Sequence, residues 1–347
     1  MPTFIRSLAL AALAAAAPSI MPAQGVPPSP ISQADLIGRL NHNVDSLAAL
    51  DQFSGVVLLA LDGKPVLQRA VGMADREAKR PNTLETAFNI GSINKVFTAT
   101  AIRQLAAAGK LDPDSTLATY WPDYPNADVA RRITIRQLLR HTSGIGGNIF
   151  AAPAGGQRHD IRRLQDYLPL FVSEPLQFEP GSKDAYSNAG FVVLGLLIER
   201  LSGESYYDYV AHHILQPAGM TRTGSYAVDS LPPTTAVGYT TGDRDAAPGA
   251  PRHSNREDLP GRGSSAGGGY STAGDLLKFM VAVQAGTIPG TPKGGLGIAG
   301  GSGGLNASLE GPLPGGYVLI VLANLDPPAA ERVSEMVRHW LGFKMDQ

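Results

Sequence analysis

Apolar residues recur at helical spacing near the start of the chain, over residues 31–50. They are Ile31, Leu36, Ile37, Leu40, Val44, Leu47 and Leu50. This spacing predicts an amphipathic helix. Residues 53–61 instead form a β-branched and leucine-rich run that ends at Asp62-Gly63, and residues 66–71 resume the strand pattern. The two runs predict a β-hairpin closed by a primed turn.

The middle of the chain, from about residue 83 to residue 285, combines helical periodicity with loops. Helices are predicted over residues 96–108, 133–140, 190–201, 206–215 and 272–284. Strand patterns return at residues 305–309 and 317–323, on either side of the turn-rich residues 311–316. A final helix is predicted over residues 327–341, with proline in its first turn.

These elements indicate an α+β fold. A helix and hairpin at the N-terminal end and a hairpin and helix at the C-terminal end would build one antiparallel sheet flanked by the terminal helices. The mostly helical segment is inserted between the two halves of this sheet. The predicted units are a sheet domain of residues 31–80 and 286–347, and a mostly helical domain of residues 81–285.

Composition fits a globular protein with a substantial core, since 43% of the 347 residues are hydrophobic and 17% are charged. The net charge of −1 gives no indication of nucleic acid or an anionic membrane as a partner. The chain has no cysteine, which excludes disulfides, thiolate metal sites and a cysteine nucleophile.

Residues 1–23 have the pattern of a signal peptide. Arg6 supplies a positive charge, residues 7–17 are almost entirely small or apolar, and Pro18 ends that run. Residues 24–30 then form a Pro-rich linker. Because the apolar run is too short to span a bilayer, we expect an exported protein, periplasmic or secreted, without a stable membrane anchor. The alternative is an N-terminal segment that is unstructured or lies on a membrane surface.

Ser92 and Lys95 stand three positions apart near the start of the helix predicted at residues 96–108. Residues with this spacing lie about one turn apart on one helix face. An amine held against a hydroxyl is one way to activate a serine nucleophile. The structural alternative makes Ser92 an N-cap and Lys95 a solvated side chain in the first turn.

Tyr186 and Asn188 stand just before another apolar helix. A phenolic oxygen near a lysine ammonium ionises more easily and can take a proton from a serine. The alternative is a loop tyrosine followed by Asn188 as a helix cap. A second Tyr-x-Asn, at Tyr124 and Asn126, shows how common this short pattern is.

Together these motifs resemble those of the serine β-lactamase and penicillin-binding-protein superfamily, in the branch of class C β-lactamases, D-alanyl-D-alanine carboxypeptidases and related esterases. The stretch from Ser92 to Lys95 matches the first motif of that branch, and the stretch from Tyr186 to Asn188 matches the second. Further stretches match the family at residues 53–63, 138–144 (LLRHTSG), 267–272 and 323–326, and all the matches occur in the family's order along the chain. The resemblance covers nearly the whole chain after the linker. It implies a β-lactamase/DD-peptidase-like α+β fold with the active site in the cleft between two domains.

The resemblance also implies roles for individual residues. Ser92 would be the nucleophile, Lys95 and Tyr186 would share the proton transfer, and Asn188 would bind a substrate amide or hold Lys95. The backbone N–H groups of Ser92 and Gly301 would form the oxyanion hole. No cofactor and no metal is implied.

The third motif is where the chain departs from that family. Relatives place a Lys- or His-x-Gly on a strand that faces the nucleophile, and the matching stretch here is Ile298, Ala299 and Gly300, followed by Gly301. Ile298 therefore replaces the polar residue, while Gly300 and Gly301 are retained as support for the substrate. The preceding segment, residues 285–297, is also short, so a strand is missing or rebuilt there. A sheet edge exposed by such a loss would need covering.

Weaker patterns are assigned structural roles. Residues 263–267 fit Gly-x-Ser-x-Gly, but the residues before them are not strand-like, so we expect a loop. His141 is expected to bond loop backbone. His212 and His213 are adjacent on a predicted helix and are expected to point to different faces.

The sequence therefore predicts an exported serine hydrolase that forms an acyl-serine intermediate on an ester, amide or β-lactam. Its partners would be small-molecule or peptide acyl substrates, and its oligomeric state is open. Loss of the polar side chain at Ile298 favours esterase-like over efficient β-lactam activity. The competing hypothesis is a catalytically impaired homologue that binds peptidoglycan or penicillin.

Overall fold

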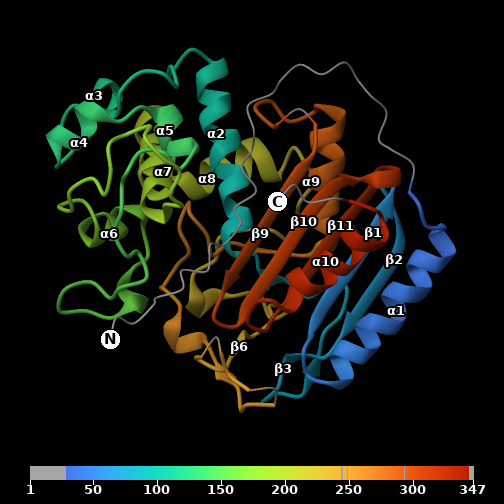
Figure 1. The fold of residues 1–347 in the computed structure, drawn as a ribbon. Helices are drawn as coiled ribbons and strands as arrows, with labels where there is room; N and C mark the ends of the chain where they lie inside the picture. The colour runs from blue at the N-terminus through green and yellow to red at the C-terminus, as the bar shows by residue number, and fades with distance from the viewer. Residues whose placement is uncertain (1–28, 244, 248, 293, 344–347) are drawn as a thin grey trace, which may run out of the picture.

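The computed structural model describes residues 29–343, apart from residues 244, 248 and 293 (Figure 1). The predicted signal peptide at residues 1–23 and nearly all of the linker at 24–30 lie outside the described residues, so both stay predictions. Within the described part, no helix is long and apolar enough to cross a membrane.

A five-stranded antiparallel sheet forms the centre of the fold, in the order β2-β1-β11-β10-β9. The N-terminal half supplies β1 (Gly55–Leu61) and β2 (Lys64–Val71). The C-terminal half supplies β9 (Leu296–Ser302), β10 (Leu305–Leu313) and β11 (Tyr317–Ala323). Because β1 pairs with β11, the two ends of the chain meet inside one sheet. The predicted α+β class and the split sheet are therefore confirmed.

The two strands that join the halves are buried on both faces. Along β1, Val56 and Leu58 face one hydrophobic core, while Val57 and Leu59 face the other. This alternation follows from the two-residue period of a strand. Gly55 lies so close to β11 that a Cβ at this position would stand 1.9 Å from the carbonyl oxygen of Leu322. The close pairing of the two halves therefore requires glycine here.

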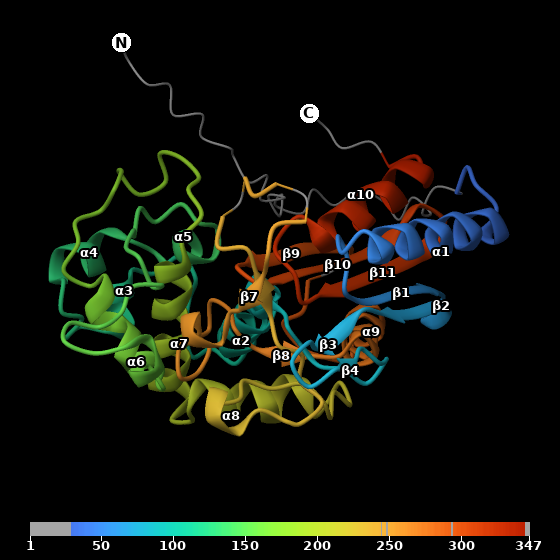
Figure 2. The same cartoon turned by 90° about the horizontal axis from the view of Figure 1, so that it is seen from below.

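The terminal helices α1 (Gln33–Ala49) and α10 (Ala329–Trp340) cover one face of the sheet (Figure 2). On α1, Leu36, Leu40 and Val44 are fully buried, as the i, i+4, i+8 spacing requires. Each of these side chains contributes about 2 kcal/mol through burial of apolar surface. The amphipathic pattern of the first helix thus fixes which side of α1 meets the sheet.

The opposite face carries α9 (Ala273–Ala285), which lies against β1 and β11. The core on this face continues without a break into α2 (Lys95–Ala107) and α7 (Asn188–Ser202) of the inserted segment. The sequence assigned α9 to the helical domain, whereas its packing partners here include the sheet. The domain bounds themselves stay a prediction.

The shorter elements connect these layers. They are β3 (Met73–Asp75), β4 (Arg80–Pro81), β5 (Phe88–Asn89), α3 (Leu117–Tyr120), α4 (Ala127–Arg132), α5 (Ile135–Leu139), α6 (Leu164–Tyr167), α8 (Tyr206–Val210), β6 (Tyr239–Thr240), β7 (His253–Ser254) and β8 (Tyr270–Ser271).

The helix predicted over residues 206–215 changes character partway. After α8 it continues as one π-turn, Ala211–Leu215. The expectation that His212 and His213 point to different faces is wrong, because both rings reach the carboxylate of Glu204, at 3.1 and 2.8 Å. The wider turn reduces the angle between adjacent side chains. Among the described residues, no group of three or more His, Asp or Glu side chains could hold a metal ion.

Candidate active site

Ser92 lies in one 3₁₀ turn, Gly91–Asn94, that runs directly into α2. The backbone before it is anchored by the N–H of Ile90, which donates to the carbonyl oxygen of Gly269 at 2.9 Å. No side-chain cap bond forms at the start of the turn or of α2, so Ser92 is not an N-cap. The structural alternative for this serine is therefore excluded.

Two candidate proton carriers meet at the hydroxyl of Ser92. The Nζ atom of Lys95 lies 3.1 Å from Ser92 Oγ, and the hydroxyl of Tyr186 lies 2.6 Å from it. The first contact comes from the three-residue spacing along the turn. The second joins residues 94 positions apart in the chain, so only the tertiary fold creates it.

Lys95 is buried, with only 4% of its surface exposed. Its amine also donates to Asn188 Oδ1 at 2.8 Å and to the carbonyl oxygen of Ala266. Burial holds the pKa of Lys95 well below its usual value, which favours the neutral amine. With two protons directed at those acceptor oxygens, the lone pair of a neutral amine is left for Ser92. Lys95 is thus arranged as a proton acceptor.

Tyr186 is half exposed, yet loss of hydration raises the pKa of its phenol, and the hydrogen bond with Ser92 only partly opposes this. The sequence instead predicts a phenol that ionises more easily beside a lysine ammonium. The structure differs, because loss of hydration is the largest cause of the shift in the pKa of Tyr186, and Lys95 is itself held towards its neutral form. Tyr186 is consequently a donor to Ser92 in the resting site.

His141 holds Tyr186 in place from both sides. The carbonyl oxygen of His141 accepts from the N–H of Ala185 at 2.9 Å, and its Nδ1 accepts from the N–H of Ser187 at 3.1 Å. Its ring stacks on Tyr186 with 4.6 Å between centroids, and on Phe191 at 5.0 Å. The expectation that His141 bonds loop backbone is confirmed, and its contacts make it a positioning residue for Tyr186.

The helix after Tyr186 begins as a serine-capped helix. Ser187 Oγ accepts from the N–H of Gly190 at 2.9 Å and donates to the carbonyl oxygen of Ile145 at 2.7 Å. Asn188 is therefore not the cap, and its side chain is free to accept from Lys95. Of the two roles expected for Asn188, holding Lys95 is the one for which the structure provides a contact.

The residues 263–267 form a loop, as expected, and this loop supplies the carbonyl oxygen of Ala266. Asn94 holds this loop by donating to the carbonyl oxygen of Ser264 at 2.9 Å. The same side chain also donates to the hydroxyl of Tyr206 at 3.1 Å. Sequence reasoning missed this contribution to the site. A backbone acceptor leaves no side-chain signal, and only the neighbouring glycines marked a close approach.

Strand β9 closes the other side of Ser92. A Cβ at Gly300 would lie 2.3 Å from the carbonyl oxygen of Ile90 and 2.8 Å from the backbone nitrogen of Ser92. A Cβ at Gly301 would instead meet Pro327, on the opposite face. The close approach of β9 to the turn therefore requires glycine at position 300. Gly301 is the next residue along β9, and it is exposed.

Ile298 lies two residues before Gly300 and so shares its face of β9. Its side chain is half-buried and packs against the core beneath the nucleophile turn. The position that the resemblance matches to a polar residue of relatives is thus apolar and lies on the face of β9 that meets the turn carrying Ser92. No strand in the described chain pairs with the outer edge of β9.

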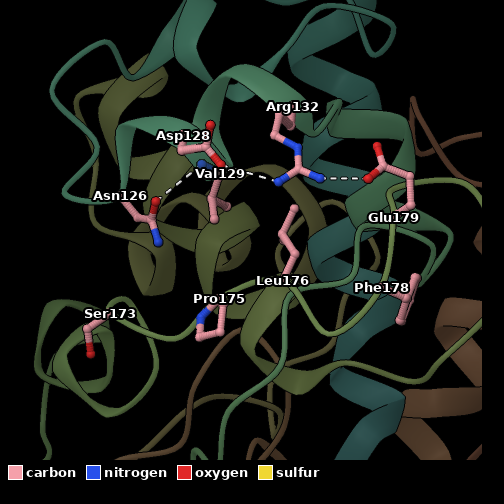
Figure 3. A pocket seen from close by; sticks show the side chains of 9 residues that line it. All are labelled: Asn126, Asp128, Val129, Arg132, Ser173, Pro175, Leu176, Phe178 and Glu179. Carbon is pink, nitrogen blue, oxygen red and sulfur yellow. Dashed lines mark hydrogen bonds and ion pairs between the residues drawn. The ribbon is translucent and has the colours of Figure 1, made fainter.

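A pocket of about 420 Å³ lies elsewhere, beside α4, and none of the candidate site residues lines it (Figure 3). Its cation, Arg132, is already paired with Asp128 at 3.2 Å and with Glu179 at 2.6 Å. Two carboxylates around one guanidinium leave no net positive charge for an anion. The pocket offers no chemistry that competes with the Ser92 network.

Comparison with known proteins gives three findings. The model of the family described as Beta-lactamase matches residues 40–317. Esterase EstB of Burkholderia gladioli is 33% identical over 292 residues, which cover 75% of this chain and 74% of the esterase. The crystal structure of a penicillin binding protein from Bacillus halodurans is 30% identical and superposes with a TM-score of 0.74, covering 86% of this chain and 98% of that one.

Two Bacillus subtilis proteins whose names describe them as penicillin-binding proteins are also similar, each at 35% identity. The chain spans only 56% and 40% of their lengths, about half on average. Their activities as whole proteins therefore do not transfer directly.

Proposed function

The chain belongs to the beta-lactamase family of serine hydrolases, and from this premise we propose that it hydrolyses esters or amides through an acyl intermediate on Ser92. The observation that carries the proposal is the position of Ser92 Oγ, 3.1 Å from Lys95 Nζ and 2.6 Å from the Tyr186 hydroxyl. A nucleophile, a desolvated base and a proton donor are the parts that acyl transfer to serine needs.

In the proposed acylation, the Ser92 oxygen bonds to the acyl carbon while its proton passes to the neutral amine of Lys95. The bond from the acyl carbon to the leaving group breaks, and Tyr186 supplies the proton that the leaving group takes up. Ser92 loses one proton to Lys95, and the leaving group gains one proton from Tyr186. Lys95 is then an ammonium and Tyr186 a phenolate, so the sum of their charges is unchanged. Water then attacks the acyl-serine by the reverse transfers.

The oxyanion of the tetrahedral intermediate would be held by the backbone N–H groups of Ser92 and Gly301. Support comes from the tight packing of β9 against the nucleophile turn, which brings the two backbones together. Backbone donors survive a change of side chain, so Ile298 does not remove them.

The apolar side chain at Ile298 favours esters and amides without a carboxylate near the reacting bond. We therefore place this protein closer to the esterases of its family than to enzymes that hydrolyse β-lactams efficiently. The sequence pattern of residues 1–23 supports export to the periplasm or outside the cell. A second candidate function is slow penicillin binding without turnover, which the altered third motif favours.

The test compares p-nitrophenyl butyrate hydrolysis with the fate of a fluorescent penicillin, using Ser92→Ala as the control. We expect ester turnover that disappears in the variant, with at most slow labelling by penicillin. Fast penicillin turnover without ester hydrolysis would overturn the substrate preference. A penicillin adduct that forms on Ser92 and never clears, without ester turnover, would establish the second candidate instead.

A further inference from the structure

The loop of residues 263–267 presents three consecutive carbonyl oxygens to the first turns of α2. Each oxygen accepts a hydrogen bond from a different side chain there. The pairs are Ser264 with Asn94 at 2.9 Å, Ser265 with Thr98 at 2.7 Å, and Ala266 with Lys95. All six residues are buried. Because a buried carbonyl group needs a partner, the loop cannot move away from α2 without leaving one of these oxygens unpaired.

The glycines of this loop have a structural reason. A Cβ at Gly263 would lie 2.5 Å from the carbonyl oxygen of Gly268, and a Cβ at Gly267 would lie 3.1 Å from the carbonyl oxygen of Gly91. The second contact is with the turn that carries Ser92. The Gly-x-Ser-x-Gly pattern therefore reflects a close approach of the loop to the nucleophile turn.

Tyr206 joins two of the side chains that hold the loop. Its hydroxyl lies 3.1 Å from Asn94 Nδ2 and 2.8 Å from Thr98 Oγ1. Tyr206 is the first residue of α8, which lies beside α2 (Figure 1). It is only 1% exposed, and burial raises the pKa of its phenol, so the hydroxyl keeps its proton.

The direction of each hydrogen bond in this group follows from the number of protons. Thr98 has one hydroxyl proton, which it donates to the carbonyl oxygen of Ser265, a group that can only accept. Tyr206 must therefore donate to Thr98, and the Tyr206 oxygen accepts from Asn94. The bonds run in one direction, from the amide of Asn94 through two hydroxyls to the loop. Bonds connected in this way strengthen one another.

We propose that Tyr206 is a positioning residue for Lys95 and acts through the loop of residues 263–267. Its hydroxyl holds the loop where the carbonyl oxygen of Ala266 accepts from Lys95 Nζ. That bond turns the lone pair of the neutral amine towards Ser92. The proposal rests on the proposed role of Ser92 as the nucleophile.

Loss of the Tyr206 hydroxyl should change the titration of Lys95. A carbonyl acceptor stabilises the ammonium more than the neutral amine, so withdrawal of Ala266 would lower the pKa of Lys95 further. Of the other described titratable side chains, Tyr186 and His141 face this amine: the Tyr186 ring centroid lies 4.7 Å from Lys95 Nζ, and the His141 ring stacks on that of Tyr186. Neither side chain is altered in the variants below.

The test is Tyr206→Phe, which removes the hydroxyl and keeps the ring. The titration of Lys95 is followed by NMR in protein that carries ¹³Cε-labelled lysine, and its signal is identified by its absence in Lys95→Met. The pH midpoint should fall by about 0.5–1 pH unit. The kcat for p-nitrophenyl butyrate should fall about three- to tenfold while KM changes little, because Tyr206 acts on the base and not on the substrate.

Tyr167→Phe is the matched control. Tyr167 is 2% exposed, and its hydroxyl donates at 2.7 Å to the carbonyl oxygen of Arg262, one residue before the loop. Its loss should lower the free energy of unfolding to a similar extent as Tyr206→Phe. The midpoint of Lys95 and the kcat should stay at the values of the parent protein.

Thr98→Val breaks the next bond of the same series with little change of shape. It should lower the midpoint of Lys95 in the same direction as Tyr206→Phe. The double variant should shift the midpoint by less than the sum of the two single shifts, because both substitutions interrupt one connected set of bonds. If Tyr206→Phe does not fold, Thr98→Val decides the proposal by the same criteria.

Three outcomes would overturn the proposal. They are a midpoint of Lys95 that is unchanged or raised in folded Tyr206→Phe, an equal shift in Tyr167→Phe, and a double variant whose shift is the sum of the single shifts. Failure of the proposed function is a separate observation. A parent protein that does not hydrolyse the ester would still show the titration of Lys95 by NMR, and the midpoints of the variants would still test the role of Tyr206.

Discussion

The two sides of Ser92 differ in how tightly the fold determines them. On the side of the inserted helices, Lys95 has three hydrogen-bond partners and Tyr186 is held by His141. On the sheet side, β9 is glycine-rich, lies at the edge of the sheet within the described residues, and carries the apolar Ile298 at the position that the resemblance matches to a polar residue of relatives. The comparison teaches that the fold fixes the Ser92 network closely on the helical side, whereas the sheet side, with Ile298, is where we propose that substrate recognition differs.

The largest effect is expected from Lys95→Met, which removes the base and keeps the length of the side chain. The kcat/KM for p-nitrophenyl butyrate should fall by about 10²–10⁴, the range typical of general-base removal. Lys110→Met is the control, since Lys110 is exposed and remote in sequence from the turn. An unchanged kcat/KM in Lys95→Met would show that another group acts as the general base.

The pH profile sharpens this prediction. Because the pKa of Lys95 is lowered by burial, the neutral amine becomes available as pH rises through that lowered value. The rate should therefore increase with pH and reach its plateau well below the usual lysine pKa. The residual rate of Lys95→Met should not show this increase with pH. An increase that persists in the variant would show that another residue titrates.

Gly300→Ala tests the sheet side. Its Cβ would collide with the backbone of Ile90 and Ser92, so β9 or the nucleophile turn must shift. We expect kcat to fall by about ten- to a hundredfold and the free energy of unfolding to fall by about 1–3 kcal/mol. Gly38→Ala, with open space around its Cβ on α1, should be neutral or slightly stabilising. Full activity in Gly300→Ala would show that β9 does not abut the site.

His141 predicts a pH-dependent stability. Burial is the main cause that lowers the pKa of His141 from 6.5 to about 4, and the fraction of Lys95 that is protonated acts in the same direction. Between these values the unfolded chain binds a proton that the folded chain does not. Stability should therefore fall as pH decreases from 6.5 to about 4, by at most about 3 kcal/mol from this residue.

The measurement is urea unfolding at several pH values for the parent and for His141→Asn. Asparagine is chosen because His141 has a φ of +58°, a conformation that asparagine tolerates. The variant should lose this part of the pH slope, and its kcat should fall while KM changes little, since Tyr186 is less firmly placed. Identical slopes in the two proteins would contradict the assignment.

The smallest effect is expected from Ile298→Lys, which restores a cation on the face of β9 that points towards Ser92. It should lower the KM for p-nitrophenyl hemisuccinate, which carries a carboxylate, by up to about tenfold, and leave the butyrate ester unaffected. Ala299→Lys is the matched control, because Ala299 is exposed and lies on the other face of the strand. An equal fall of this KM in Ile298→Lys and Ala299→Lys would show that the effect is general electrostatic attraction and does not depend on the face of β9.

The sequence predicted the regular parts of this molecule well. The helix with Leu36 and Leu40 and the strand at residues 317–323 follow from periodicity and burial, which act locally. The grouping of Ser92 with Lys95 follows from helical spacing. The contact between Ser92 and Tyr186 does not, since it depends on how α2 and α7 pack, and only the family resemblance indicated it.

Other features could not be predicted because they depend on backbone atoms or on folding context. The acceptor at Ala266 is a carbonyl group that any residue could supply. The direction of the pKa shift of Tyr186 depends on desolvation, which the order of residues does not reveal. The shared contact of His212 and His213 with Glu204 depends on a single π-turn.

The most direct test of the central claim is to label the protein with a fluorophosphonate and map the adduct by peptide mass. Ser265→Ala is the matched control, because Ser265 is the serine of the Gly-x-Ser-x-Gly stretch and is buried in a bond to the carbonyl oxygen of Phe191. We predict one adduct, on Ser92, in the parent and in Ser265→Ala, and none in Ser92→Ala. An adduct that persists in Ser92→Ala, or a folded parent protein that takes no label, would contradict this account.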